Sequence, residues 1–430
     1  MGDLAAKNAK SAKGEGVLTQ RRREAESAET AWPMVRLGDV CEEICRVKSL
    51  SPQPDEIEYI DISSVDRVSK RVETTTRHTR ETMPGRAQQL VEMGDVLIST
   101  VRPNLNAVAI IERKHNDYPL VASTGFCVVR PKNVLLSEFL YWYSQSSDFI
   151  EPLVAVSEKA SYPSVTDKIV KDLTIPLPPL SVQREIVERL EKELGEAEKV
   201  AAGFRRIAEN AEAEFKAELD ETFKALEDDV SRGGAETRRV RLGDVCEIQR
   251  GGSPRPIKKF ITTADDGLNW IKIGDVAADG KYIVKVEEKI KPSGLNKTRQ
   301  VKVGDFLLSN SMSFGRPYIL KIEGCIHDGW LVLKGFQEKF TEDYFYYLLR
   351  SSAVQAQFDT MAHGSSVRNL NTRAVSMVDV TEIPLSAQHT IVTRLDAARE
   401  RCDKIKAEAE KGLGAAENLR KAILKEAFEQ

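Results

Sequence analysis

The 430-residue sequence lacks the features that mark membrane-spanning, secreted or disulfide-rich proteins. No apolar run approaches the roughly 18 residues that a membrane helix needs. The first residues contain no apolar segment of the kind found in secretory signals. Six cysteines are scattered without a CxxC pair, a pattern typical of reduced and mostly buried thiols. We therefore expect a cytoplasmic protein that has no membrane partner.

The sequence also lacks the motifs of common enzyme classes. It contains no Gly-rich phosphate loop of the Walker type and no GxGxxG fingerprint. The Asn/Asp-Pro-Pro-aromatic signature of amino-methyltransferases is absent, since the Pro178-Pro179 pair follows Leu177. The acids within residues 54–58 lack the trailing lysine of nuclease clusters, and the five histidines show no ligand spacing. We therefore expect no catalytic residue, metal site or cofactor in this chain.

What the chain does contain is an internal repeat. Arg36–Glu42 recurs 205 positions later as Arg241–Glu247, and Gly94–Ser99 returns with small changes as Gly304–Ser309. Three further landmarks follow in the same order: Phe139–Tyr143 with Phe345–Leu349, Ile175–Leu177 with Ile383–Leu385, and Gln183–Leu190 with Gln388–Leu395. Five landmarks at a nearly constant offset indicate that the chain is a duplication.

Each copy begins with about 150 residues in which short β-rich runs alternate with Gly, Pro and Asn/Asp turns. The expected strands include residues 58–62, 94–98 and 126–129 in the first copy and 270–273, 305–308 and 330–333 in the second. One short amphipathic helix is expected near the end of each β-rich part, around residues 137–149 and 342–355.

Each copy ends in a long helix with a single apolar stripe. The stripe advances by alternating steps of three and four residues from Ile186 to Val230 and from Ile391 to Ala427. Gly412 and Gly414 should weaken the second helix by roughly 1 kcal/mol each. A helix with one apolar face cannot bury that face alone, so we expect the two helices to form one antiparallel coiled coil. The β-rich domains would then lie at opposite ends of a rod and be related by a pseudo-twofold axis.

The expected fold class is therefore α+β. Its parts are an N-terminal tail or short helix (1–30), a β-rich domain (31–180), a first spacer helix (181–230), a second β-rich domain (231–385) and a second spacer helix (386–430).

Charge is distributed unevenly along a chain of ordinary globular composition, with 41% hydrophobic and 30% charged residues. The net charge is -3, yet residues 181–230 carry -7 and residues 231–385 carry +5. The acidic face of the first long helix fits protein contact better than DNA contact, with a solvated helix face as the equal alternative. Any surface for a polyanion must therefore be local.

Several loops combine residue types that suit DNA. Arginine can bind guanine through two hydrogen bonds, Asn and Gln can bind adenine, and Ser, Thr and Lys bind phosphates. The candidates in the first copy are Arg77, Arg80, Arg86, Arg102, Asn104, Lys159, Ser161 and Tyr162. Those in the second copy are Arg250, Arg255, Lys258, Lys259, Asn310, Ser311, Arg316, Ser365, Ser366, Arg368 and Asn369. The Arg250–Lys259 and Ser365–Asn369 loops rank first, because small residues allow close backbone approach. For any one residue, the alternative is an ordinary solvated side chain.

In combination, these landmarks resemble the specificity subunit of type I restriction-modification systems. The resemblance rests on the paired Leu-Gly-Asp-Val-Cys-Glu segments, on the Gly-Gly-Ser-Pro loop followed by Trp270–Asp275, on the Pro-Pro-Leu-Ser-Val-Gln segment before the first long helix, and on the ending Ala422–Glu429. It covers roughly residues 32–430. The second copy departs from the pattern, because Ile383–Gln388 lacks the Pro-Pro-Leu of the first, which shortens a linker.

The resemblance implies two target-recognition domains, each of which reads one half of a bipartite, asymmetric sequence in double-stranded DNA. The coiled coil would set the number of unspecified base pairs between the half-sites. Two modification subunits would bring S-adenosylmethionine and methylate adenine, and two restriction subunits would use ATP and Mg. This chain would supply sequence choice only.

The main alternative is a non-catalytic scaffold that binds proteins or carbohydrate through two β-rich domains on a coiled coil. DNA recognition predicts that affinity falls steeply with salt and depends on sequence, whereas a scaffold does not require either. A single-chain methyltransferase is disfavoured by the missing motifs.

Overall fold

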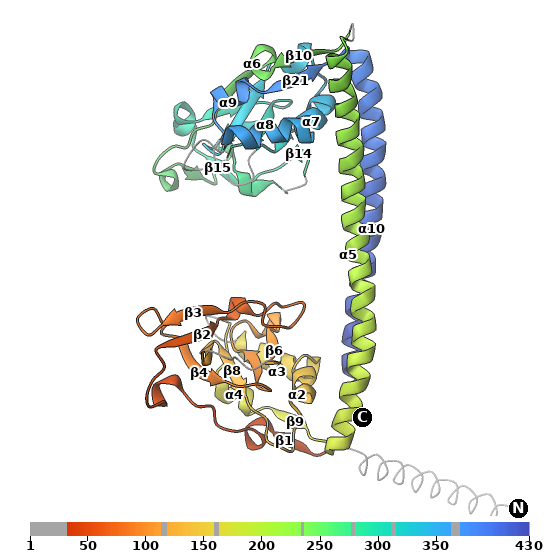
Figure 1. Ribbon diagram of the computed structural model, residues 1–430. Helices are drawn as coiled ribbons and strands as arrows, with labels where there is room; N and C mark the ends of the chain where they lie inside the picture. Colours follow the sequence, from red (N-terminus) through yellow and green to blue (C-terminus); the bar gives the residue numbers. More distant parts are fainter. Residues whose placement is uncertain are drawn as a thin grey trace, which may run out of the picture. The chain divides into compact units, whose positions relative to one another are not determined.

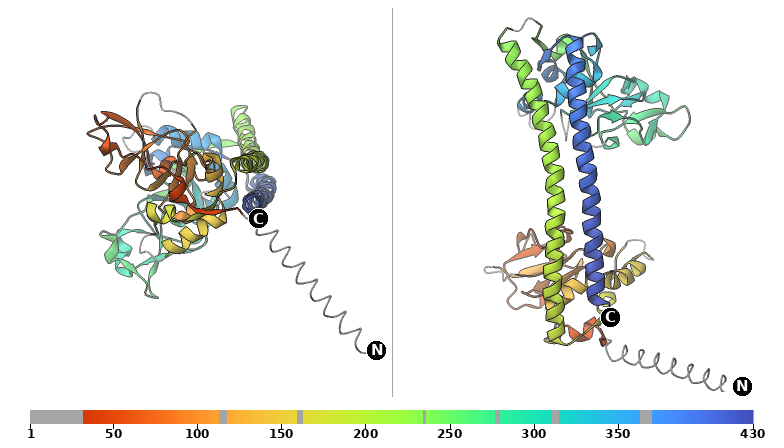
Figure 2. Two further views of the ribbon diagram at one scale, coloured as in Figure 1. Left: turned by 90° about the horizontal axis from the view of Figure 1, so that it is seen from below. Right: turned by 90° about the vertical axis from the view of Figure 1, so that its right-hand side faces the viewer.

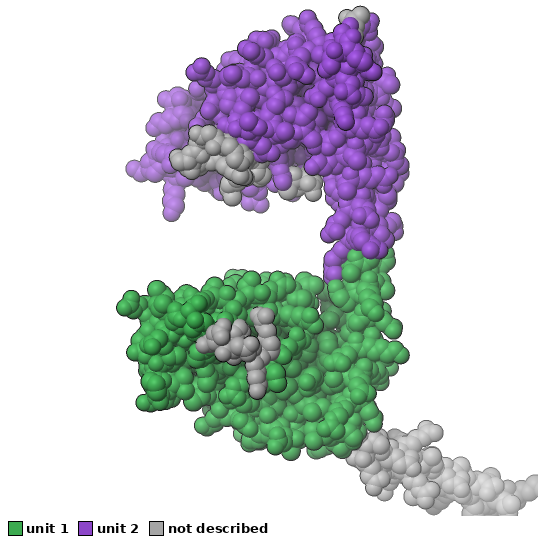
Figure 3. Space-filling model, viewed as in Figure 1, with its two compact units in different colours: residues 1–204, 411–430 green, residues 205–410 purple. Residues whose placement is uncertain are grey.

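The computed structural model describes residues 32–112, 118–158, 163–233, 236–276, 280–310, 315–362 and 370–429. The expected N-terminal tail or helix lies outside these residues. The chain forms two compact units: unit 1 contains residues 1–204 and 411–430, and unit 2 contains residues 205–410 (Figure 3). Each unit therefore combines one β-rich part with segments of both long helices, and each is described separately below.

The β-rich part of unit 1 is built from three small sheets (Figure 1). A four-stranded sheet has the order β3-β2-β7-β4, a three-stranded sheet has the order β6-β5-β8, and β1 pairs antiparallel with β9. The strands are β1 (Met34–Arg36), β2 (Glu56–Ile60), β3 (Thr76–Thr79), β4 (Ala87–Val91), β5 (Val96–Ser99), β6 (Val108–Ile110), β7 (Leu120–Ser123), β8 (Phe126–Val129) and β9 (Thr174–Pro176). The helices are η1 (Leu37–Val40), η2 (Val47–Ser49), η3 (Ile62–Ser64), η4 (Pro103–Leu105), α2 (Ser137–Tyr143), α3 (Ser147–Ser157) and α4 (Asp167–Lys171).

Unit 2 repeats this plan with larger sheets. Two five-stranded sheets have the orders β11-β20-β17-β18-β14 and β12-β15-β13-β19-β16, and β10 pairs antiparallel with β21. The strands are β10 (Arg238–Arg241), β11 (Glu247–Arg250), β12 (Ile261–Thr262), β13 (Leu268–Ile271), β14 (Tyr282–Ile283), β15 (Glu288–Ile290), β16 (Arg299–Val301), β17 (Phe306–Ser309), β18 (Pro317–Leu320), β19 (Gly324–Ile326), β20 (Trp330–Lys334) and β21 (Asp379–Glu382). The helices are α6 (Leu242–Val245), η5 (Ile257–Lys259), η6 (Ile273–Asp275), η7 (Pro292–Lys297), α7 (Glu342–Arg350), η8 (Phe336–Glu338), α8 (Ser352–Ala362) and α9 (Thr372–Ser376).

The strands expected from the sequence are present, and their starts agree within two residues. The single helix expected at the end of each β-rich part is wrong, because the structure has two, α2 and α3 in one copy and α7 and α8 in the other. The hydroxyl of Ser146 donates to the carbonyl of Tyr143 at 2.7 Å, and that of Ser351 donates to Leu348 at 2.8 Å. Such local bonds compete with the helical ladder, so both helices end at the same place in the repeat.

The repeated Leu-Gly-Asp-Val-Cys segment forms a short helical turn under each β-rich part. Leu37 and Leu242 are fully buried, and their backbone N–H groups donate to Leu173 and Val378 at 2.9 Å. The cysteine that follows, Cys41 or Cys246, donates its thiol to the leucine carbonyl. Burial raises the pKa of the Cys246 thiol to about 12. All six cysteines are free and five are buried, as expected from their scattered positions.

The long helices are α5 (Leu180–Ser231) and α10 (Leu385–Phe428), which confirms the helices expected from the apolar stripe. Figure 2 shows them side by side within each unit. In unit 1, Leu190 and Leu194 pack with Leu424, and in unit 2 Phe215 and Leu219 pack with residues of α10 that include Leu395. Within unit 1, Gly412 also lies against Phe204, and within unit 2 Glu212 pairs with Lys406 while Glu218 pairs with Arg394. In each unit, later residues of α5 thus meet earlier residues of α10, so the pairing is antiparallel.

Ion pairs accompany this packing in unit 2. Glu212 pairs with Arg399 and Lys406 at 3.0 Å, and Glu218 pairs with Arg394 and Arg401 at 3.0 Å. Part of the acidic charge of α5 is therefore neutralised by α10 rather than exposed to solvent.

Each β-rich part is attached to the start of one long helix by a buried glutamine. Gln183, fully buried, donates to the carbonyls of Val134 and Pro178 at 3.0 and 2.8 Å. Gln388 is buried in the same way and donates to Lys339 and Ile383 at 2.7 and 3.0 Å. In both copies the amide oxygen accepts a backbone N–H at 2.8 Å. This shared task explains why the Gln landmark occurs twice.

The same parts also rest on the end of the other long helix. Phe139 packs edge-to-face on Phe428 at 5.4 Å in unit 1, and Tyr344 packs on Phe223 at 5.6 Å in unit 2. Phe428 and Phe223 are 205 positions apart, as are Tyr344 and Phe139. The residue of the second copy that is equivalent to Phe139 in the structure is therefore Tyr344. It lies one residue before Phe345, with which the sequence repeat aligned Phe139.

No helix among the described residues is long and apolar enough to cross a membrane.

Candidate nucleic-acid interface

The first two candidates of unit 1 are Arg77 on β3 and Arg80 directly after it, and ion pairs within the domain neutralise both. Arg77 pairs with Glu56 on β2, and its guanidinium carbon lies 4.0 Å from the centre of the Tyr118 ring. The hydrogen bond from Arg77 keeps the pKa of the Glu56 carboxyl below its usual value. Arg80 pairs with Asp55 at 3.2 Å. These arginines are exposed but have fixed partners within the domain.

A second group in unit 1 lies in and around the turn after β5. Arg102 and Asn104 are exposed, and Arg102 has a left-handed backbone with φ of 50°. The Arg102 N–H donates to the Pro163 carbonyl at 2.8 Å, which fixes the backbone. Among the described residues, the Arg102 guanidinium forms no ion pair. Arg86 is also exposed, directly before β4.

In unit 2, the loop after β11 carries four exposed cationic side chains. Arg250, Arg255, Lys258 and Lys259 are all exposed within ten residues, and the Arg255 side chain is 79% exposed. Lys258 and Lys259 lie on η5, just after Arg255. All four candidate side chains of this loop are therefore accessible to solvent, and their contact with DNA stays a prediction.

The glycines of this loop pack against the protein itself. A Cβ atom at Gly251 would lie 2.1 Å from the His327 carbonyl oxygen, and one at Gly252 would lie 2.7 Å from that of Lys297. The Gly251 N–H also donates to the Trp330 carbonyl at 2.9 Å. The small size of these glycines thus lets the start of the loop pack closely against the backbone of the protein itself.

Asp328, in the turn between β19 and β20, contacts several of these residues, and sequence reasoning missed it. Its carboxylate accepts from the Ser253 hydroxyl at 2.6 Å and from Arg255 at 3.2 Å. Its carbonyl accepts from Arg250 Nε at 3.2 Å and from Asn310 Nδ2 at 2.8 Å. The Asp-Gly pair Asp328-Gly329 signals a turn, but nothing in the sequence indicates the contacts.

The bond from Ser253, together with the nearby Arg255, keeps the pKa of Asp328 below its usual value. Asn310 is 1% exposed, so its side chain lies beneath the surface, where it donates a hydrogen bond to the Asp328 carbonyl.

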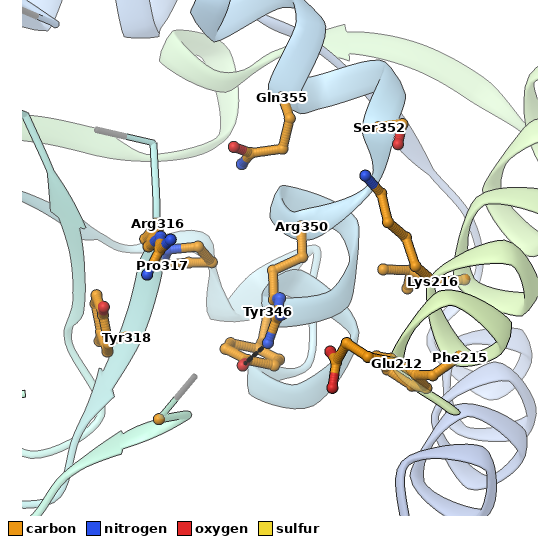
Figure 4. A pocket seen from close by; sticks show the side chains of 12 residues that line it. Glu212, Phe215, Lys216, Arg316, Pro317, Tyr318, Tyr346, Arg350, Ser352 and Gln355 are labelled. Carbon is orange, nitrogen blue, oxygen red and sulfur yellow. Dashed lines mark hydrogen bonds between the residues drawn. The ribbon is translucent and has the colours of Figure 1, made fainter. Parts of the chain in front are cut away.

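Arg316 lies at a cavity of about 330 Å³ within unit 2 (Figure 4). Arg350 and Lys216 also line it, and Arg350 donates to the Tyr346 hydroxyl at 2.6 Å. Glu212 supplies the carboxylate among the described lining residues, and its partners on α10 already neutralise it. The wall of this cavity is therefore cationic.

The remaining candidates lie outside the described residues: Lys159, Ser161, Tyr162, Ser311, Ser365, Ser366, Arg368 and Asn369. Among the residues that are described, no group of three His, Cys, Asp or Glu side chains could hold a metal ion.

The fold defines a duplicated, non-identical pair of β-rich domains attached to long helices, and the second domain carries a net positive charge. A family model described as the type I restriction modification DNA specificity domain matches residues 29–198 and again residues 236–413. The chain therefore belongs to this family, and it is a specificity subunit of a type I restriction-modification system with a role in DNA recognition.

Relatives agree with this assignment. The specificity subunit of the type I restriction enzyme HindI from Haemophilus influenzae is 26% identical over 160 residues, which span 36% of this chain and 34% of that subunit. The EcoKI specificity subunit from Escherichia coli K12 is 21% identical over 359 residues, covering 79% of this chain and 75% of that one. A chain from a structure described as the basis of complex assembly and conformational transition of the type I R-M system is 26% identical, with a TM-score of 0.68 over 93% of this chain and 98% of that one.

Proposed function

We propose that this chain selects a bipartite, asymmetric DNA target, with one half-site bound by each β-rich domain. It directs partner adenine methyltransferase and ATP-dependent endonuclease subunits to that target. The chain itself contributes sequence choice, while S-adenosylmethionine, ATP and Mg are bound by the partners.

The observation that carries this proposal is the contrast between repeated attachments and unlike loops. Gln183 and Gln388 make equivalent contacts, so both domains are attached to a long helix in the same way. The loops differ: unit 2 has the cationic Arg250–Lys259 loop, whereas the candidate arginines of unit 1 are spread over β3, the residue after β3, the residue before β4 and the turn after β5. Equal attachment with different side chains is what two distinct half-sites require, and the target is then not a perfect palindrome.

The long helices provide the spacer of this proposal. Helix α5 is continuous over 52 residues and α10 over 44. Continuous helices are stiff and rise about 1.5 Å per residue, so their length sets how many unspecified base pairs separate the half-sites.

The partners of the proposal are two modification and two restriction subunits. The assembly described for the related solved structure of a type I R-M system supports this view. The faces of α5 and α10 that point away from the other helix are the proposed docking surface for the modification subunits.

The test is selection from randomised duplex DNA by the full chain co-purified with its modification subunits. Bound sequences should share two short blocks at a fixed spacing, and affinity should fall steeply between 50 and 200 mM salt, by roughly 10³-fold or more. Binding that enriches no sequence and barely depends on salt would support the protein- or carbohydrate-binding scaffold instead.

A further inference from the structure

The side chain and carbonyl of Asp328 connect three segments that are far apart in the sequence. Ser253 and Arg255 follow β11, Asn310 follows β17, and Asp328 lies between β19 and β20. Two of the four charged residues in the Arg250–Lys259 loop, Arg250 and Arg255, donate to this one residue. The turn is therefore the place where the geometry of the basic loop is determined.

A carboxylate on a DNA-binding surface has an electrostatic cost. Asp328 is 45% exposed and ionised, so it repels phosphates that the neighbouring arginines and lysines attract. A surface that served only to attract DNA would be better without it. Its presence needs a second task that outweighs this repulsion.

Orientation of Arg255 is such a task. Reading guanine requires the planar guanidinium to lie in the plane of the base edge, with two hydrogen bonds formed at once. A free arginine loses side-chain entropy when it adopts one such geometry. An acceptor that fixes the guanidinium beforehand removes part of that cost and narrows the bases that fit. The Ser253 hydroxyl in turn fixes the carboxylate.

The corresponding turn of unit 1 has no carboxylate that could orient an arginine in this way. Strands β7 and β8 occupy the places of β19 and β20, since β7 pairs parallel with β2 as β19 does with β13, and β8 pairs with β5 as β20 does with β17. The residues between β7 and β8 are Thr124 and Gly125, neither of which is a carboxylate. The arrangement is thus particular to the second domain.

We propose that Asp328 is a positioning residue that orients Arg255 and its loop, and so determines which base the second domain accepts at one position of its half-site. The inference rests on the proposed function and deepens it. It assigns to Asp328 an effect on one half-site, while the half-site bound by the first domain does not depend on it.

The test uses Asp328→Asn in the full chain assembled with its modification subunits, with DNA selection as the measurement. Discrimination at one position of the second half-site should fall roughly tenfold, while the first half-site stays unchanged. Affinity for non-specific DNA should stay equal or rise, because a negative charge is removed. Higher non-specific affinity with unchanged discrimination would overturn the proposal and leave an electrostatic effect alone.

The matched control is Glu288→Gln, which breaks the 2.8 Å ion pair with Lys272 in the same domain at a similar exposure. It should leave the selected sequence unchanged. If Asp328→Asn lowers the melting temperature, Ser253→Ala takes its place, since it keeps the charge and loses only the two hydrogen bonds that join the Ser253 hydroxyl to Asp328. An unchanged base preference in that variant would again overturn the proposal.

A double-mutant cycle with Arg255→Ala tests the link itself. Asp328→Asn should change the base preference little once Arg255 is gone, because the two act through one contact. Fully additive effects would contradict the link. If the unaltered chain selects no sequence at all, the proposed function fails rather than the role of Asp328.

Discussion

Arg102 has a backbone conformation that arginine seldom adopts. A non-glycine residue with φ of 50° carries strain of about 1 kcal/mol or more, and it persists only where neighbouring contacts require it. Here the Arg102 N–H donates to Pro163 and its carbonyl accepts from Leu105 at 2.9 Å. The strained backbone holds Arg102 in an exposed turn of unit 1. Strain of this kind is common at functional sites, which favours Arg102 among the candidates of the first domain.

Replacing Arg102 by alanine should relax specificity at one position of the half-site bound by the first domain, by about 1–3 kcal/mol of discrimination. The physical reason is the loss of one base contact without loss of the surrounding fold. Mapping of methylated sites in cells that carry the variant measures the effect. Arg36→Ala, which removes an exposed arginine paired with Asp172 in the same unit, is the control and should leave the pattern intact. An unchanged pattern in Arg102→Ala would assign Arg102 to the scaffold.

For single residues, the sequence predicts the charge of a loop but not its contacts with distant segments. The types and density of charge in the Arg250–Lys259 loop could be predicted, because a loop rich in Arg, Lys and Gly is visible in one dimension. The role of Asp328 could not, since its partners Ser253 and Arg255 are more than 70 positions away. Asn310 has a suitable side chain for adenine, yet folding buries it under the same turn. Contacts between distant segments decide which of the suitable residues reach the surface.

At the scale of elements, the attachment of each β-rich part to a long helix depends on a few buried groups. Gln388 satisfies the carbonyls of Lys339 and Ile383 and the N–H of Thr341, all within 3.0 Å. Buried backbone groups without partners cost about 1–3 kcal/mol each. One side chain therefore links strand β21, the loop before α7 and the first turn of α10.

Gln388→Ala should destabilise unit 2 by roughly 2–4 kcal/mol, because three buried backbone groups lose their partner. Urea unfolding of the full chain measures the free energy. Gln300→Ala, at an exposed position of the same unit, is the control and should change stability by less than about 0.5 kcal/mol. A loss no larger than that of the control would show that water replaces the glutamine.

The two glycines of α10 behave differently despite identical chemistry. A Cβ atom at Gly412 would lie 2.4 Å from the Phe204 ring, whereas nothing lies within 4 Å of one at Gly414. The expected loss of helix propensity at both glycines stays a prediction, and at Gly412 the missing side chain also makes room for Phe204. The apolar period of α10 predicted the helix, but only the partner helix explains this glycine.

Gly414→Ala should stabilise the chain by about 0.5–1 kcal/mol through helix propensity. Gly412→Ala should destabilise it by about 1–3 kcal/mol, because the ring of Phe204 must leave its place. Thermal unfolding of the two variants, each the control of the other, measures the difference. Equal stabilisation by both would contradict the packing of Phe204 on Gly412.

For the whole molecule, duplication explains more than any single element. Each compact unit takes its β-rich part from one copy and its helical support from both, which is why Phe139 rests on Phe428 and Tyr344 on Phe223. The five landmarks in the sequence were enough to predict the duplication, and the apolar stripes predicted the antiparallel pair of helices. The support of each β-rich part by both helices was not predicted. The candidate DNA-binding loops were harder to predict, because the two copies differ there.

Removal of seven residues from each long helix, 201–207 and 409–415, tests the spacer. Each cut is centred on the pair formed by Phe204 and Gly412, so the heptad pattern and antiparallel pairing continue on both sides. Each helix shortens by about 10 Å, or roughly three base pairs of DNA. The half-sites should keep their sequences while the distance between them decreases. An unaltered distance would exclude the long helices as the determinant of spacing.

The central claim, that two unlike domains choose one divided target, is tested most directly by genome-wide mapping of methylated adenines. The cell should carry this chain and its modification subunits, and no other adenine methyltransferase. We expect a single motif made of two different short blocks, separated by a constant number of unspecified bases. A continuous motif, or methylation without any shared sequence, would contradict it.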